Sequence, residues 1–347
     1  MVASLLAGLA LGLLDVRLKP LVAEGPQIVI GPTNRWAPDE PRIGVFPGYE
    51  ITRPLSVVLP GRTDPVLRAQ VCAQSSSLTT DIDWASRAIG RSWELMNVHL
   101  GLDLPTTVEE RTVHVLLRTD GNAGGEQQLT RPPGVASDMP WCVIYIYQVP
   151  TLTAPAERWR EVAHEYGHAV FPAWGPYEGP ESWSNGEIGE RLATAWMYDA
   201  LLDGSAAPED AAGASAQSLL GYMQTNVWAE AVRVGQRGPQ PELLEGKSGA
   251  SFWAGVRLVT FAQQVLPEKV LRRSLGLSGG ANPKDFADAM VEAVAEQPTI
   301  RLRIPRGNIG KPVWLPTGSL KVSARVLAKK DGWSQISTSN STVVLTR

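Results

Sequence analysis

The sequence has few cysteines, few histidines and few charges for its length. Two cysteines, Cys72 and Cys142, and four histidines occur among 347 residues, and charged residues make up 19% of the chain. Two cysteines allow at most one disulfide, as in an exported protein, and buried free thiols are the alternative. A hydrophobic content of 44% permits an ordinary core, and the sequence contains no internal repeat and no low-complexity tract.

Basic clusters and membrane-spanning stretches are also missing. A net charge of −3 without a basic run argues against a dedicated nucleic-acid-binding protein. The uncharged run Val2 to Leu14 has the length of a signal-peptide core and is too short to span a membrane, and Arg17 and Lys19 follow it instead of preceding it. We therefore expect residues 1–23 to be a signal peptide or an N-terminal apolar helix, and the protein to be secreted or periplasmic.

The most informative feature is the pentapeptide from His164 to His168, in which Glu165 directly follows the first histidine. Residues four apart lie one turn above each other on an α-helix, so both imidazoles can bind one ion from a single helix face. Glu165 then points to the space where a water held by that ion would lie, and it can take the proton of that water. This HExxH arrangement predicts Zn²⁺ bound by His164 and His168, with Glu165 as the general base.

The surrounding residues predict that the motif lies in the middle of a helix. Pro155 suits a first helical turn, no helix breaker occurs between it and the motif, and Pro172 ends the run. An apolar stripe that includes Val162 and Tyr166 would bury one face of this helix. The structural alternative is a buried helix whose histidines are satisfied by hydrogen bonds and bind no metal.

A catalytic zinc needs a third protein ligand, and no histidine follows His168 in the chain. Trp174 stands where a metzincin would have its third histidine, and the two upstream histidines have ordinary surroundings. Two carboxylates in the next predicted helix, Glu187 and Glu190, are therefore the candidates.

HExxH followed by such a glutamate resembles the gluzincin branch of zinc metallopeptidases, which includes the thermolysin-like and aminopeptidase-like families. In these families the third ligand is a glutamate on a following helix, commonly with a small residue three positions later. Glu190 with Ala193 fits this local pattern, whereas Glu187, with eighteen residues between it and His168, fits the aminopeptidase spacing. The resemblance implies a zincin-like metallopeptidase domain of the α+β class, with Zn²⁺ held by His164, His168 and Glu190.

Two features bear on the choice between the glutamates. Ser184 and Glu187 have the spacing of a capping box, which would occupy Glu187 at the helix start and leave Glu190 one turn further in. We favour Glu190 for this reason, and Glu187 remains open. Four residues after Glu190, where gluzincins often have an acidic residue that orients a histidine, this chain has Thr194.

The residue that would stabilise the oxyanion is not identified by the sequence. Phe252 stands nearest to the position of the tyrosine that serves this purpose in aminopeptidase-like families, and it has no hydroxyl to donate. Three tyrosines follow the motif, and nothing in the sequence chooses among them: Tyr177, Tyr198 and Tyr222.

The rest of the chain predicts mixed secondary structure. Residues 24–79 are rich in Pro and Gly with short strand-like stretches and form a β-rich lead-in. Residues 80–296 form the catalytic domain with a helical second lobe, and residues 297–347 form a small β appendage or strands that pair with the lead-in. Trp141 to Tyr147, just before the HExxH helix, is either the edge strand along which zincins align an extended peptide or a buried central strand.

These observations predict a zinc-dependent peptidase whose substrates are peptides or proteins, glycosylated proteins included. Trp174 and Trp183 lie between the predicted ligand helices and could supply aromatic walls for such substrates. One alternative is a zincin-like binding or surface module that keeps the metal but has lost efficient turnover, and another is a structural domain without metal. The sequence does not distinguish an endopeptidase from an exopeptidase, and it leaves the oligomeric state open.

Overall fold

The computed structural model describes residues 15–21, 25–35, 49–108, 111–130, 139–178, 181–279 and 282–347. The apolar run Val2 to Leu14, predicted as a signal peptide or helix, lies outside the described residues. The chain divides into two units, unit 1 with Met1–Val98, Asp103–Val170 and Met197–Ser218, and unit 2 with His99–Leu102, Phe171–Trp196 and Leu219–Arg347. The division passes through helix α3 (Asn185–Asp203), which is itself continuous.

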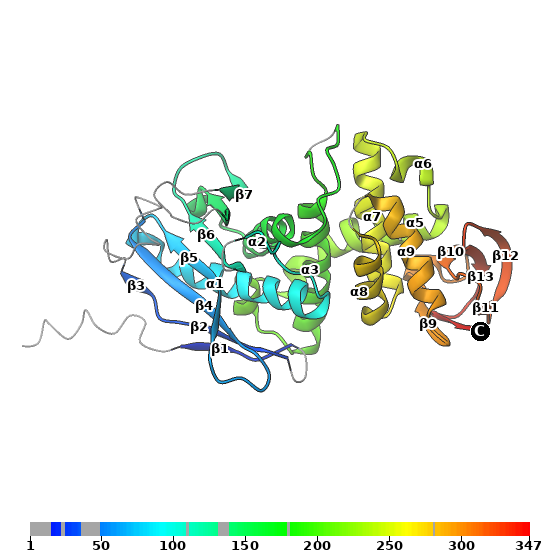
Figure 1. Ribbon diagram of the computed structural model, residues 1–347, viewed down its shortest axis with the longest axis horizontal. Helices are drawn as coiled ribbons and strands as arrows, with labels where there is room; N and C mark the ends of the chain where they lie inside the picture. The colour runs from blue at the N-terminus through cyan, green and yellow to red at the C-terminus, as the bar shows by residue number, and fades with distance from the viewer. Residues whose placement is uncertain are drawn as a thin grey trace, which may run out of the picture. The chain divides into compact units, whose positions relative to one another are not determined.

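Unit 1 is built on one mixed sheet, in which eight of the described strands are paired (Figure 1). Its order is β1-β2-β4-β5-β6-β8-β7, with β3 paired to β4, and the β5–β6 and β6–β8 pairs are parallel. Strands of the predicted lead-in, residues 24–79, therefore belong to the same sheet as β6 and β8. The strands are β1 (Val16–Leu18), β2 (Gln27–Ile30), β3 (Asn34–Arg35), β4 (Ile51–Val58), β5 (Val66–Ala73), β6 (Val113–Leu117), β7 (Gly124–Thr130) and β8 (Trp141–Tyr147).

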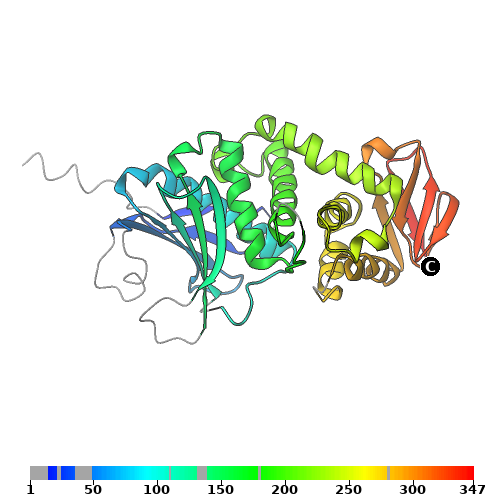
Figure 2. The ribbon, with the colours of Figure 1, turned by 90° about the horizontal axis from the view of Figure 1, so that it is seen from above.

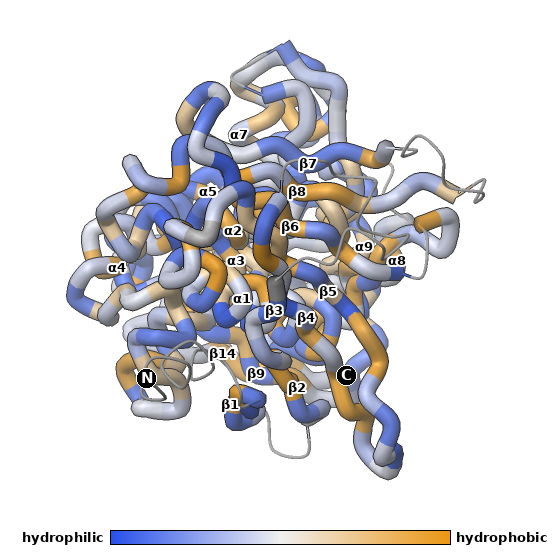
Figure 3. The backbone as a smooth tube through the Cα atoms, turned by 90° about the vertical axis from the view of Figure 1, so that its left-hand side faces the viewer, coloured by the Kyte–Doolittle hydropathy of each residue, from blue (hydrophilic) through white to orange (hydrophobic). Residues whose placement is uncertain are grey.

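Hydrophobic content decides which strands are central and which lies at the edge. Every residue of β6 is buried, and so are five of the seven residues of β8. The polar strand β7 has no fully buried residue and pairs with β8 alone at the sheet edge. Figure 3 shows this contrast, with β8 mostly orange and β7 largely blue. Trp141 to Tyr147 is thus an interior strand, and β7 is the edge strand beside it.

Helices α1 (Thr79–Trp93) and α2 (Pro155–Val170) cover the same face of this sheet (Figure 2). α1 packs on β4 and β5, and a Cβ at Gly90 would lie only 2.9 Å from Leu55 Cδ1. Glycine at this crossing therefore lets the helix approach the sheet closely. α2 packs on β8 and β7, which places the HExxH helix beside the sheet edge.

The two cysteines are free and buried. Cys72 lies on β5 and Cys142 on β8, with β6 between them, and they pair with Leu116 and Val113 of β6. Because side chains alternate along β6, the two thiols point to opposite faces of the sheet. They are also separated by two strand spacings of about 4.8 Å, beyond the Cα separation of about 7 Å that a disulfide allows. The alternative of buried free thiols is confirmed.

Both thiols should be unreactive in the folded protein. Burial raises the pKa of Cys72 and of Cys142 from 9.0 to about 12. Only on the order of 10⁻⁴ of each thiol is then ionised at pH 8, and the thiolate is the reactive form. Ellman's reagent should detect no thiol in the native protein and two per chain after unfolding in guanidinium chloride without reductant. No thiol after unfolding would mean that a disulfide had formed.

Unit 2 is mostly helical before residue 296. The π-helix Met223–Trp228 joins α4 (Ala216–Tyr222) to α5 (Ala229–Arg237) in one helical run, whose first turn still belongs to unit 1. π-Turns of this kind often occur at functional sites. The helices that follow are α6 (Pro241–Leu244), α7 (Gly249–Val265), α8 (Glu268–Leu277) and α9 (Pro283–Ala295).

The C-terminal residues form two three-stranded antiparallel sheets, β10-β13-β12 and β11-β14-β9. Within the described chain these strands pair with one another and not with the lead-in. Asp331 and Gly332, with φ of 48° and 75°, form a two-residue turn between β12 and β13, a turn for which an Asp-Gly pair is typical. The strands are β9 (Thr299–Arg303), β10 (Pro312–Pro316), β11 (Lys321–Val322), β12 (Arg325–Lys330), β13 (Trp333–Ser337) and β14 (Thr342–Thr346).

The chain is thus a mixed α+β structure, as the sequence predicts at this level. None of the helices in the described ranges has the length and apolar composition needed to cross a membrane. Two structural features position the residues considered next: the attachment of α2 to the sheet beside β7, and the irregular segment that connects α2 to α3.

Candidate metal centre

Helix α2 contains the HExxH residues and buries its opposite side. Trp159, Val162 and Tyr166 are fully buried, whereas His164 and His168 are half-buried. The Tyr166 hydroxyl donates a hydrogen bond of 2.7 Å to Asn97 Oδ1, in the π-helix Glu94–His99 that extends α1. This bond and the apolar contacts fix the rotation of α2 about its axis, and they thereby fix the side to which both imidazoles point.

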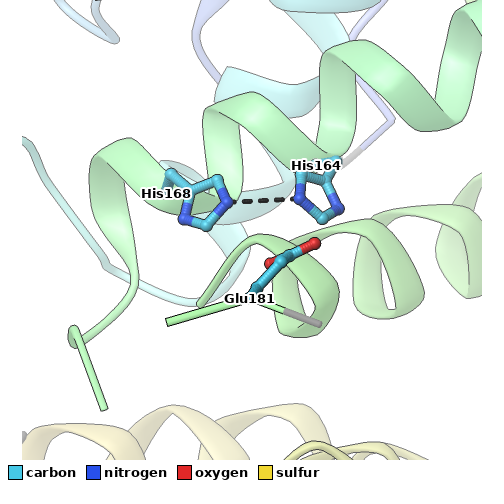
Figure 4. A group of neighbouring side chains, drawn as sticks. All are labelled: His164, His168 and Glu181. Atoms are coloured by element: carbon cyan, nitrogen blue, oxygen red, sulfur yellow. Dashed lines mark hydrogen bonds between the residues drawn. The ribbon is translucent and has the colours of Figure 1, made fainter. Parts of the chain in front are cut away.

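The two imidazoles converge on one point. His164 Nε2 and His168 Nε2 lie 3.2 Å apart, and the ring planes are inclined at 71° (Figure 4). Two nitrogens that bind one tetrahedral Zn²⁺ at about 2.0–2.1 Å lie about 3.3 Å from each other. The pair therefore fits a single zinc ion without any rearrangement of the helix.

A carboxylate completes this pair. The candidate ligand atoms of His164, His168 and Glu181 all lie within 4.8 Å of one another, and Figure 4 shows the Glu181 carboxylate directed towards the His164 ring. Glu181 lies in the irregular segment between α2 and α3. Two imidazoles and one carboxylate, with a fourth position for water, form the donor set of many catalytic zinc sites. The structure therefore contains a His/His/Glu group that could hold a metal ion.

Glu190 and Glu187, the ligands considered from the sequence, lie near His164 in a second group. The candidate ligand atoms of His164, Glu187 and Glu190 also lie within 4.8 Å of one another, and this group does not include His168. Glu190 is buried, with 8% of its surface exposed. Three glutamates, Glu181, Glu187 and Glu190, thus lie close to His164, whereas a single zinc with two histidine ligands requires only one carboxylate ligand.

Glu187 also interacts with a buried arginine. Arg191, which is 4% exposed, donates from Nε to Glu187 Oε2 at 3.2 Å. Its Nη1 donates to the Asn226 carbonyl oxygen at 2.8 Å, and its guanidinium lies 5.2 Å from the Trp253 ring centroid. Because the arginine charge offsets the charge of this carboxylate, Glu187 is a weaker ligand for a cation than an unpaired carboxylate would be.

Tyr222 is the tyrosine that the structure connects with these carboxylates. Burial raises its pKa well above the usual value, and the nearby charges of Glu190 and Glu187 raise it further. The hydroxyl therefore keeps its proton at neutral pH and can donate a hydrogen bond. Tyr177, by contrast, packs edge-to-face on Phe252 at 5.6 Å between ring centroids.

Glu165 lies beneath the edge strand. It is 4% exposed, and a Cβ at Gly125 of β7 would stand 2.5 Å from its Cγ and 2.8 Å from its Cδ. The missing side chain at Gly125 therefore leaves the room that the Glu165 side chain occupies. The geometry connects the residue predicted as general base with the strand at the sheet edge.

Glu181 is the residue that the sequence interpretation missed. Its signal is weak, because it lies outside any regular element and no fixed spacing relates it to HExxH. An acidic residue among the aromatic and proline residues after Pro172 is the only sequence feature that could have pointed to it.

Comparisons with protein families, with curated proteins and with solved structures find no match for this chain. The geometry around His164 and His168 is therefore the basis for assigning a function. Its two main features are the separation of the two Nε2 atoms and the carboxylates beside them.

Proposed function

We propose that this protein is a zinc-dependent peptidase. The observation that carries the proposal is the convergence of His164 Nε2 and His168 Nε2 at 3.2 Å, with a carboxylate close to both imidazoles. The ion would be held by the two histidines and one glutamate, Glu181 by geometry or Glu190 by family resemblance. When bound, Zn²⁺ supplies Lewis-acid polarisation of the scissile carbonyl and lowers the pKa of a water molecule.

Glu165 would move the proton. It directly follows His164 on α2, and its burial beneath Gly125 restricts its orientation. It would take the proton of the attacking water and then deliver that proton to the leaving amine, so that it returns to the carboxylate form. Tyr222, which lies beside Glu190 and Glu187, is our candidate for the hydrogen bond to the developing oxyanion.

Strand β7 would align the substrate. In the described part of the chain it pairs with β8 on one side only, so the backbone groups of its other side are available to an extended peptide. Gly124 and Gly125, which begin β7, carry no side chain to obstruct a peptide backbone. A substrate bound in this way would lie beside Glu165, because Gly125 and Glu165 are in contact.

Hydrolysis by zinc-loaded protein tests this proposal. We expect a mixture of quenched fluorescent peptides, or a denatured protein such as casein, to be cut. Removal of the metal with EDTA should stop cleavage, and added Zn²⁺ should restore it. Bound zinc with no cleavage of any peptide or protein would contradict the peptidase proposal and favour a zincin-like binding module instead.

Gly125→Ala should impair hydrolysis without removing the metal. The added methyl group would displace the Glu165 side chain, since the Cβ would lie 2.5 Å from Cγ, while both histidines keep their places on α2. We expect hydrolysis to fall by about tenfold to a hundredfold, because a misplacement of about 1 Å can have this effect. Zinc per chain and initial rates are the measurements.

Gly276→Ala is the matched control for this substitution. A Cβ at Gly276 of α8 would meet nothing within 4 Å, so zinc content and rate should both stay unchanged. If Gly125→Ala lost zinc in proportion to its lost activity, the substitution would be acting on the metal ligands and not on the position of Glu165.

A further inference from the structure

A second candidate site lies wholly within unit 2, where α5, α6 and α7 pack together (Figure 1). A cavity of about 170 Å³ opens there, and all of its lining residues come from the stretch between Arg233 and Leu258. None of the residues of the metal centre lines it. The cavity is therefore separate from the proposed catalytic residues.

The inner wall of this cavity is apolar. Val234, Leu244 and Leu258 line it and are buried, and Leu243 and Ala254 add further hydrocarbon surface. The turn that follows α5 forms another wall, and Gly238 within it has a φ of 73°. A Cβ at Gly238 would lie 2.9 Å from Trp314 Cγ, so the turn is held close to the underlying tryptophan. The cavity thus has a fixed apolar side that can cover a hydrocarbon group.

Positively charged side chains also line the cavity. Arg233, Arg237 and Arg257 line it, and none of the described lining residues is acidic. Glu230 lies nearby and pairs with two of the arginines, accepting from Arg233 Nη1 at 3.0 Å and lying 2.6 Å from Arg257 Nε. Arg237 is thus the one lining arginine that Glu230 does not pair with.

Arg237 has no ion pair with any residue in the described ranges, and its side chain is exposed at the end of α5. A cation at this position also interacts favourably with the dipole of a helix C-terminus. That interaction accounts for Arg237 alone. Glu230 accounts for the other two arginines, so Arg237 is the cation of this cavity that is available to a ligand.

The apolar and the arginine lining residues together restrict the chemical class of the ligand. Guanidinium groups bind carboxylates through paired hydrogen bonds, and this interaction is stronger than one between neutral groups. An inorganic anion would leave the leucine side chains in contact with water, and a pure hydrocarbon would leave Arg237 without an anionic partner. We propose that the cavity binds an apolar residue with a free carboxylate, as found at the C-terminus of a peptide or in an N-acylated amino acid.

A second, smaller cavity adjoins the first. It has a volume of about 60 Å³ and shares the lining residues Pro239 and Leu244 with the larger one. Its other lining residues include Trp333 and Asp331, and Lys284, which pairs with Asp288 at 2.7 Å. The residue before the C-terminal one would reach this cavity, so a peptide would bind more tightly than a single N-acylated amino acid.

Calorimetric titration of the full chain tests the proposal. N-acetyl-leucine should bind at least about tenfold more tightly than N-acetyl-leucinamide, because hydrogen bonds to a charged group are lost in the amide. Arg237→Gln should weaken binding of the acid by about tenfold for the same reason. The matched control is Arg273→Gln on α8, an exposed arginine that pairs with Glu296 and does not line the cavity, and it should bind like the wild type.

A second variant tests the cavity independently of charge. Ala254→Leu would fill the space from α7 without changing any charged residue, and it should weaken binding of N-acetyl-leucine by about tenfold or more. The acetylated tripeptide Ala-Ala-Leu distinguishes the two sources of the ligand. Tighter binding than that of N-acetyl-leucine indicates a peptide C-terminus, and equal binding indicates a small N-acylated amino acid; either result supports the site.

Three results would overturn the site. They are no measurable binding of either acid, equal binding of acid and amide, and wild-type affinity in both Arg237→Gln and Ala254→Leu. Because no lining residue belongs to the metal centre, these results are independent of whether the protein hydrolyses peptides.

Discussion

Zinc content should fall from about one ion per chain to almost none when His168 is replaced by alanine. The substitution removes one of two imidazoles whose Nε2 atoms are 3.2 Å apart. The other candidate group, His164 with Glu187 and Glu190, has a single imidazole, and Arg191 shares the Glu187 carboxylate, so we expect that group to bind zinc much more weakly. Elemental analysis after dialysis is the measurement. His99→Gln is the control, because His99 lies 3.1 Å from Glu268 Oε2 and belongs to neither candidate metal group.

Three glutamate variants in the same experiment identify the third ligand. Geometry predicts that Glu181→Gln weakens zinc binding most, by more than about a hundredfold, which exceeds the 10- to 100-fold effect of replacing residues outside the ligand shell. Glu187→Gln should retain zinc, since Arg191 shares that carboxylate. Zinc lost from Glu190→Gln alone would establish the ligand expected from the gluzincin resemblance and contradict the choice of Glu181. No zinc in the wild type, even after loading, would remove the metal centre altogether.

The local elements near the site could be predicted from the sequence because their signals are local. Pro155 and Pro172 bracket the helix α2 (Pro155–Val170), and the four-residue spacing of its histidines determines their common side. The apolar run Trp141 to Tyr147 predicts strand β8 with the bounds that the structure shows. Asp331 and Gly332 identify a hairpin turn from the sequence alone.

The edge strand could not be predicted, because its structure depends on a partner. β7 consists of glycine, glutamate, glutamine, leucine and threonine without the alternation of a half-buried strand, and its conformation comes from pairing with β8. A second difference between sequence pattern and structure occurs near the C-terminus. Leu320, Val322, Ala324 and Val326 alternate with polar residues as in a single strand, but the structure divides this stretch between β11 and β12, which belong to different sheets.

The third ligand is hard to predict for the same physical reason. A helix sets the distance between His164 and His168 from their spacing, whereas the path of residues 171–184 depends on contacts distant in sequence. The sequence favours Glu190 because Ala193 follows it three residues later and because a capping box would occupy Glu187. Glu181 comes close to both imidazoles only after the irregular segment has folded.

Glu165→Gln should nearly abolish hydrolysis while leaving zinc bound. Glutamine has almost the shape of glutamate, so the buried site beneath Gly125 can accept it, but an amide cannot take a proton from water. General acid–base catalysis contributes a factor of about 10²–10⁴, and we expect a loss of about a thousandfold. Initial rates, zinc per chain and melting temperature are the measurements, and the last two should match the wild type.

Glu157→Gln is the control for loss of a carboxylate from the same helix. Glu157 is exposed in the first turn of α2, two turns before the motif, and its substitution should change neither rate nor zinc content. Full hydrolysis by Glu165→Gln with zinc bound would mean that another group takes the proton, and the role proposed for Glu165 would be wrong. We expect Glu165→Gln and Gly125→Ala to lose rate without losing zinc, and the controls Glu157→Gln and Gly276→Ala to lose neither. This result would separate the proton-transfer role of Glu165 from the metal-binding role of the histidines.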